Sequence, residues 1–192
     1  MDVVGPLRVF GGAGDVRPFV GGPDVAITLV AEERRTIVLS HGARMEADED
    51  YETCPALDVL VVPGGSSRTP EIGRRAQQRN PATIAFIVQA PRSASLVCSV
   101  CTGTFLLAEA GLLAGKRAST NWQFRDELQT LMRQRGEDFE LVKERVVWDG
   151  ALVTAGGVTS GIDLALSILE SMSGEDVRRA VERSLELVTP TA

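Results

Sequence analysis

The stretch Ser95-Leu-Val-Cys-Ser-Val-Cys-Thr-Gly-Thr-Phe-Leu-Leu-Ala-Glu-Ala-Gly-Leu-Leu113 changes its hydrophobic period at one residue, Cys101. Residues 96–100 are a short apolar run, which is typical of a buried parallel strand. From Phe105 onward the apolar residues recur with the spacing of an amphipathic helix. No loop-length spacer separates the two patterns. The stretch therefore predicts a strand that turns directly into a helix at Cys101.

A side chain at such a turn sits on a tight backbone and projects above the sheet, as a nucleophile does in a nucleophile elbow. The first amides of the following helix lack intrahelical acceptors and carry the positive end of the helix dipole. We therefore expect a lowered pKa for the Cys101 thiol and a nucleophilic thiolate. The alternative is that Cys101 is a small buried apolar residue, as most free cysteines are.

Length and composition indicate one globular domain over residues 1–192. A chain of 192 residues has room for one sizeable core, and 44% hydrophobic with 24% charged residues is ordinary globular usage. The formal net charge is −6, and basic residues are scattered rather than gathered in a stripe. These features predict no nucleic-acid partner.

No apolar segment has the length of a membrane span, and the N-terminus has no signal-peptide pattern, so we expect a cytoplasmic protein without a membrane partner. Three cysteines without an export signal indicate reduced thiols. Cys98 and Cys101 form a C-x-x-C pair, but two further metal ligands are lacking and His41 is the only histidine. We predict no metal, and we interpret His41 as an exposed hairpin residue.

The rest of the chain alternates strand and helix patterns, which predicts a largely parallel sheet covered on both faces. The Gly-rich residues 1–23 favour loops and turns around a short helix at 7–10. Expected strands are 24–30, a hairpin of 36–40 with 44–47, 57–62, 96–100, 116–120, 139–142, 145–148 and 151–154. Expected helices are 69–79, 81–90, the one after Cys101, 122–135, 160–172 and 173–187.

Four segments together resemble the ThiJ/PfpI superfamily, whose fold is flavodoxin-like and class I glutamine-amidotransferase-like. They are Leu57-Asp-Val-Leu-Val-Val-Pro-Gly-Gly65, Ser99-Val-Cys-Thr-Gly-Thr104, Ala110-Gly-Leu-Leu-Ala-Gly-Lys-Arg-Ala118 and Gly156-Gly-Val-Thr-Ser-Gly-Ile-Asp163. The resemblance implies a doubly wound α/β domain with an elbow cysteine, and it is closest to the isocyanide hydratase branch. Thr102 replaces the histidine that follows the nucleophile in the protease-like branch, which disfavours a Cys-His hydrolase.

The isocyanide hydratase branch pairs its cysteine with an aspartate in a D-x-x-G-P segment, and Asp2-Val-Val-Gly-Pro6 is similar to it. The resemblance implies Cys101 as nucleophile, Asp2 as general acid and base, and Thr102 as a hydroxyl that orients water or an intermediate. The backbone amides of Gly65 and Thr102 are candidates to stabilise negative charge. The implied enzyme is a cofactor-independent lyase that hydrates a small isocyanide to an N-substituted formamide through a thioimidate, and a homodimer is expected.

The sequence departs from this pattern in three places. Relatives carry an apolar strand before the D-x-x-G-P segment, whereas this sequence begins at Met1-Asp2, so we expect either a start internal to a longer protein or another segment in the gap. Without that strand, Asp2 is not expected to be held in position. Thr120-Asn121-Trp122 lacks the histidine common before the tryptophan, and the chain ends soon after Leu187.

Other functions remain open from the sequence alone. The same kind of domain forms the sensor half of AraC-type transcription regulators, although no recognition-helix pattern follows here. A redox-sensing protein whose Cys101 is oxidised, or an inactive paralogue, is also consistent with the residues.

Overall fold

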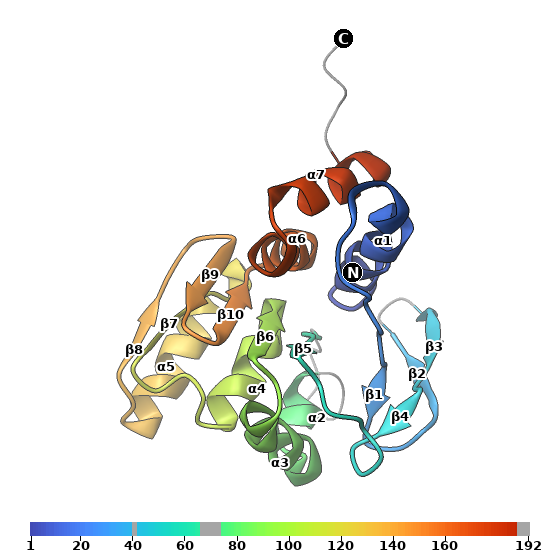
Figure 1. The fold of residues 1–192 in the computed structure, drawn as a ribbon. Coiled ribbons are helices and arrows are strands. Elements are labelled where there is room, and N and C mark those ends of the chain that lie inside the picture. The colour runs from blue at the N-terminus through green and yellow to red at the C-terminus, as the bar shows by residue number, and fades with distance from the viewer. Residues whose placement is uncertain (40–41, 66–73, 188–192) are drawn as a thin grey trace.

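The computed structural model describes residues 1–39, 42–65 and 74–187, and its centre is a four-stranded sheet (Figure 1). The strand order is β5 (Val59–Val62), β6 (Leu96–Val100), β10 (Leu152–Ala155) and β9 (Val146–Asp149). The first three strands are parallel, and β9 pairs antiparallel with β10. The predicted α/β fold with a mostly parallel sheet is confirmed.

Within the described ranges, three two-stranded sheets lie beside this central sheet. The predicted hairpin is present as β2 (Thr36–Val38) and β3 (Arg44–Glu46), while His41 between them lies outside the described residues. Parallel pairs are formed by β1 (Val30–Ala31) with β4 (Glu49–Asp50) and by β7 (Lys116–Ala118) with β8 (Phe139–Leu141).

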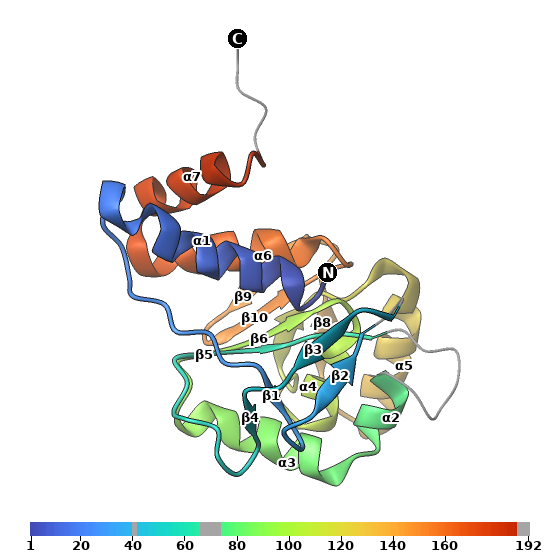
Figure 2. The ribbon, with the colours of Figure 1, turned by 90° about the vertical axis from the view of Figure 1, so that its right-hand side faces the viewer.

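Helices cover both faces of the sheet (Figure 2). One face carries α1 (Val4–Val20), α6 (Ser160–Ser173) and α7 (Glu175–Ser184). The other carries α2 (Arg74–Gln78), α3 (Pro81–Gln89), α4 (Thr104–Glu109) and α5 (Arg125–Arg135), with the short 3-10 turns η2 (Ala90–Arg92), η3 (Cys101–Gly103) and η4 (Trp122–Phe124). Among the described helices, none combines the length and the apolar character that a bilayer span requires.

The loops predicted for residues 1–23 are wrong, because α1 is one continuous helix through Gly11, Gly12 and Gly14. Its glycines allow close packing against the C-terminal helices. A Cβ at Gly12 would lie 3.2 Å from Val181 Cγ1, and one at Gly5 would lie 3.2 Å from Ile162 Cγ1. Burial of Val9, Ala13 and Val16 in this helix cluster therefore outweighs the low helix propensity of glycine.

The strand predicted over residues 24–30 is also largely wrong, since only Val30 and Ala31 are paired. In the sheet, β5 is hydrogen-bonded to β6 along one edge, and no described strand is paired with its other edge. The segment before Val30 therefore has no described strand with which it could pair. A strand needs such a partner to satisfy its backbone groups, which is why propensity alone gave the wrong answer.

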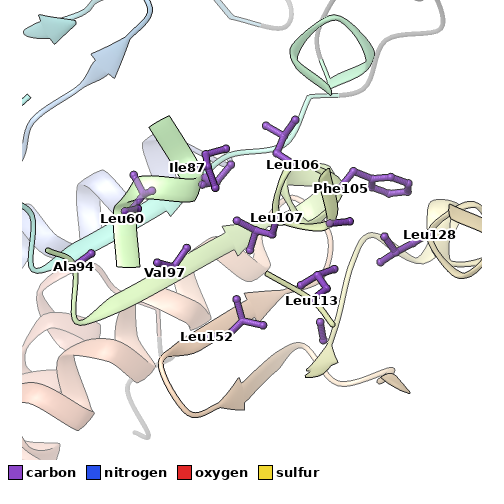
Figure 3. Packing of buried hydrophobic residues seen from close by; sticks show 14 of the residues in the cluster. Leu60, Ile87, Ala94, Val97, Phe105, Leu106, Leu107, Leu113, Leu128 and Leu152 are labelled. Atoms are coloured by element: carbon purple, nitrogen blue, oxygen red, sulfur yellow. The ribbon is translucent and has the colours of Figure 1, made fainter. Parts of the chain in front are cut away.

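The larger core lies between the sheet and the face formed by α3, α4 and α5 (Figure 3). Leu60, Val97 and Leu152 supply the sheet side, one from each parallel strand. Leu107 and Leu128 pack onto them from α4 and α5 and are fully buried. Because α4 begins three residues after Cys101, its burial fixes the position of the turn at the end of β6.

Two glycine substitutions separate packing from helix propensity. In Gly103→Ala the new Cβ would lie 2.2 Å from the carbonyl oxygen of Val62, so we expect a loss of more than about 3 kcal/mol in the free energy of unfolding. In Gly11→Ala nothing lies within 4 Å of the new Cβ inside α1, so we expect a gain of about 0.5–1 kcal/mol. Urea unfolding of both variants checks the prediction, and equal effects would contradict it.

Candidate functional site

Cys101 occupies the turn at the end of β6 with a backbone φ of 60°, in the left-handed region that non-glycine residues rarely adopt. Such a conformation costs about 1–3 kcal/mol and persists only when the surroundings impose it. Here the Cys101 N–H donates to Gly156 O at 2.8 Å, and the Cys101 carbonyl accepts from Thr120 Oγ1 at 2.7 Å. These bonds hold the predicted elbow in place and fix where the sulfur points.

Buried hydroxyl groups form hydrogen bonds around the turn at Cys101. The sequence did not predict them. Thr104 Oγ1 lies 2.9 Å from Ser99 Oγ and donates to Ser119 O at 2.9 Å, and Thr154 Oγ1 accepts from Ser119 N at 2.8 Å. All four residues are fully buried. The hydroxyls thereby connect β6 and β10 with the chain that leaves β7.

Asp2 lies next to the sulfur of Cys101. Its Oδ2 accepts from the Gly64 N–H at 3.2 Å, and its carboxylate accepts a hydrogen bond from Cys101. The expectation that Asp2 would not be held in position is wrong, because α1 begins two residues later. Pro6 of that helix packs closely against Gly161, where a Cβ would lie 3.1 Å from Pro6 Cδ.

Thr102 and Gly65 hold each other in a reciprocal pair. Thr102 Oγ1 accepts from the Gly65 N–H at 3.0 Å and donates to the Gly65 carbonyl at 3.2 Å. The neighbouring Gly64 approaches so closely that a Cβ there would lie 2.6 Å from Thr102 N and 2.8 Å from Asp2 Oδ2. The structure thus brings together all the residues predicted for the site, namely Asp2, Gly65, Cys101 and Thr102.

Asn121 is a further contact of the sulfur that sequence reasoning missed. Its Nδ2 donates to Cys101 Sγ at 3.4 Å, and its Oδ1 accepts from the Gln123 N–H at 3.0 Å. The available signal was its place between the end of a strand and the start of a helical turn, where an Asn side chain commonly caps the helix. From the sequence, position 121 stood out only because it lacks the histidine common before the tryptophan.

The pKa of the Cys101 thiol is raised above its ordinary value, first by burial and then by the negative charge of Asp2. Hydrogen bonds from the Asn121 side chain and from the N–H groups of Thr102 and Val158 act in the opposite direction. The expectation of a lowered thiol pKa is therefore wrong. Burial also raises the pKa of Asp2, against the lowering effects of the N-terminal charge and of the bonds from Cys101 and Gly64.

The other two cysteines do not share this environment. Cys98 is fully buried, and burial raises its pKa to about 12. Cys54 is half-buried and its pKa is raised by burial and by Glu49. In the described ranges, no three His, Cys, Asp or Glu side chains gather as metal ligands. The described residues of the site offer one thiol, one carboxylate and several neutral N–H donors.

Comparisons with known proteins show which proteins this chain resembles. The profile of the DJ-1/PfpI family matches residues 1–171. The chain is 37% identical over 186 residues to an isonitrile hydratase of Pseudomonas putida, which covers 97% of this chain and 72% of that protein. It is 28% identical over 152 residues to the HTH-type transcriptional regulator CdhR of Pseudomonas aeruginosa, covering 79% of this chain and 41% of the regulator.

Among solved structures, a ThiJ/PfpI family protein from Pseudomonas syringae superimposes with a TM-score of 0.82 at 28% identity. That alignment covers 100% of this chain and 71% of the other. The fold, the elbow cysteine and the sequence match over most of the chain agree with one another, and this chain belongs to the DJ-1/PfpI family.

Proposed function

We propose that this protein is a cofactor-independent isocyanide hydratase, a lyase that adds water to R–N≡C and releases the formamide R–NH–CHO. The contact between the Cys101 thiol and the Asp2 carboxylate carries the proposal, because it pairs a nucleophile with a group that can take up its proton. The 37% identity to an isonitrile hydratase supports the same reaction, since isonitrile and isocyanide are two names for one functional group.

In the first half of the proposed reaction, the thiol is the resting form of Cys101. Its proton moves to Asp2 as sulfur forms a bond to the terminal carbon of the isocyanide. Asp2 then delivers that proton to the same carbon, which gives the thioimidate R–N=CH–S–Cys101 and restores the carboxylate. Positioned proton transfer of this kind contributes about 10²- to 10⁴-fold in rate.

In the second half, water attacks the thioimidate carbon and one of its protons passes through Asp2 to nitrogen. The carbon–sulfur bond then breaks, the remaining hydroxyl proton moves through Asp2 to sulfur, and the formamide leaves. The N–H of Thr102 stabilises negative charge on the sulfur in both halves. The role of the Thr102 hydroxyl in orienting water stays a prediction. The Gly65 N–H now donates to Thr102 Oγ1, so this hydrogen bond must break before the N–H can stabilise negative charge on the substrate.

A substrate assay with three variants tests the reaction. Incubation with a simple alkyl isocyanide should yield the N-alkyl formamide, measured by chromatography and mass spectrometry. Cys101→Ala should abolish turnover because no sulfur remains to attack, and Asp2→Asn should reduce kcat about 10²-fold or more because the proton carrier is lost. Cys54→Ala, which changes a thiol outside the site, is the control and should retain full activity. Turnover by Cys101→Ala would refute the covalent step.

The pH profile of kcat/KM follows from the two raised pKa values. Below the pKa of Asp2 the carboxylate is protonated and cannot accept the thiol proton, so activity falls on the acid side. Above the pKa of Cys101 both groups are charged and no proton remains for the substrate, so activity falls on the alkaline side. We expect a bell-shaped profile whose acid limb lies above the ordinary carboxyl pKa of 3.8 and whose alkaline limb lies above the ordinary thiol pKa of 9.0.

The same electrostatics predict opposite effects of one substitution on two reactions. Removal of the Asp2 charge in Asp2→Asn should lower the pKa of Cys101 and speed its alkylation by iodoacetamide at pH 7, while isocyanide hydration slows. Peptide mass spectrometry resolves alkylation at Cys101 from that at Cys54. Parallel losses of both reactivities would mean that Asp2 only supports the fold.

A second function, ligand sensing without turnover, is favoured by the similarity to a transcription regulator. In that case an isocyanide or another small molecule would stabilise the protein against heat without formation of product. Oxidation sensing at Cys101 is less favoured, because a buried thiol with a raised pKa contains little thiolate at neutral pH.

We also propose that the protein is a cytoplasmic homodimer, and measurement of its mass in solution by light scattering tests the dimer.

A further inference from the structure

Asn121 is fixed in one orientation beside the reacting sulfur. The residue is 8% exposed and follows β7 at the start of η4. Its Oδ1 accepts from the Gln123 N–H at 3.0 Å, so the other end of the amide, Nδ2, faces Cys101 Sγ at 3.4 Å. A flipped amide would place Nδ2 against the Gln123 N–H, which is itself a donor. The capping bond therefore decides which end of the side chain the sulfur meets.

Among the residues that the structure describes, the hydrogen-bond partners of the Cys101 sulfur are several donors and one acceptor. Asn121 Nδ2 and the N–H groups of Thr102 and Val158 donate to it, and the Asp2 carboxylate accepts from it. A thiol has a single proton. With donors directed at the sulfur from three neighbours, that proton is directed toward Asp2. A side chain at position 157 would disturb this arrangement, because a Cβ at Gly157 would lie 3.2 Å from Asn121 Nδ2.

We propose that Asn121 is a catalytic residue of the hydration reaction, in which its side-chain N–H stabilises the sulfur whenever the sulfur carries negative charge. This assignment rests on the proposed function. Charge develops on sulfur twice, when the thiol proton leaves for Asp2 and again when the carbon–sulfur bond of the intermediate breaks. An amide side chain does not ionise near neutral pH, so the ability of Asn121 to donate this hydrogen bond does not change with pH.

Two substitutions at this position separate the donor from the helix cap. Asn121→Asp keeps an oxygen for the Gln123 N–H but places an acceptor at the sulfur, whereas Asn121→Ala removes both interactions. Asn80 provides a matched control, since its Oδ1 caps α3 by accepting from the N–H groups of Ala82 and Thr83. Asn80→Ala therefore loses a comparable cap, worth about 0.5–2 kcal/mol of stability, at a position away from Cys101.

The first measurement is the rate of Cys101 alkylation by iodoacetamide as a function of pH, followed on the Cys101 peptide by mass spectrometry. We expect the midpoint to move to higher pH in Asn121→Ala, to move further in Asn121→Asp, and to stay unchanged in Asn80→Ala. This measurement needs no isocyanide, so it tests the hydrogen bond between Asn121 and the Cys101 sulfur even if the protein hydrates no isocyanide. An unchanged midpoint in both Asn121 variants would overturn the proposal.

The second measurement is isocyanide hydration by the same proteins. Hydrogen bonds to charged groups contribute enough for a loss of about 10- to 100-fold in kcat in both Asn121 variants, with little change in KM. Asn80→Ala should retain the kcat of the unmodified protein. A kcat in Asn121→Asp equal to that of Asn80→Ala would show that Asn121 acts only as a cap.

Discussion

The left-handed backbone of Cys101 is the constraint on which the rest of the site depends. A φ of 60° lets the chain leave β6 and enter a helical turn without a loop, and Cys101 stays buried in one apolar cluster with Val153 and Leu164. The conformational cost of about 1–3 kcal/mol is offset by hydrogen bonds to Gly156 and Thr120, which come from two other parts of the chain. Glycine at 103 and at 64 follows from the same geometry, because each packs against backbone atoms that leave no space for a Cβ.

Burial, not the helix dipole, decides the charge state of the thiol. Interaction of a charge with a helix terminus contributes at most about 2 kcal/mol, equivalent to about 1.5 pKa units, and α4 is only six residues long. Desolvation of a buried group moves its pKa by up to about 3–5 units, and the Asp2 charge acts in the same direction. A neutral thiol next to a carboxylate is therefore the resting pair, and the pair carries one negative charge and one transferable proton. An uncharged isocyanide can enter such a site without a large cost of desolvation.

The sequence predicted the elbow and the sheet well because both follow from local patterns. The change of hydrophobic period at Cys101 placed the end of β6 at the correct residue, and Pro63-Gly64-Gly65 marked the end of the neighbouring strand. Residues 1–30 were predicted poorly for a tertiary reason. Glycines that favour turns in isolation lie in α1, where they let the helix approach Ile162 and Val181, and the mostly apolar segment before Val30 has no described strand to pair with. The contact between Cys101 Sγ and Asn121 could not be predicted from the sequence either, because the two residues are 20 positions apart and each follows the end of a different strand.

The difference between asparagine and histidine at position 121 bears on how the proton is controlled. A site that uses one proton needs one group that accepts it and returns it, and Asp2 fills that role through its contact with Cys101. An imidazole beside the sulfur titrates near neutral pH and could accept the proton itself, which would leave the carboxylate without it. The amide of Asn121 donates a hydrogen bond but cannot take up the thiol proton. With amide and backbone N–H groups as its other partners, the sulfur can exchange its proton with Asp2 alone among the described residues that contact it.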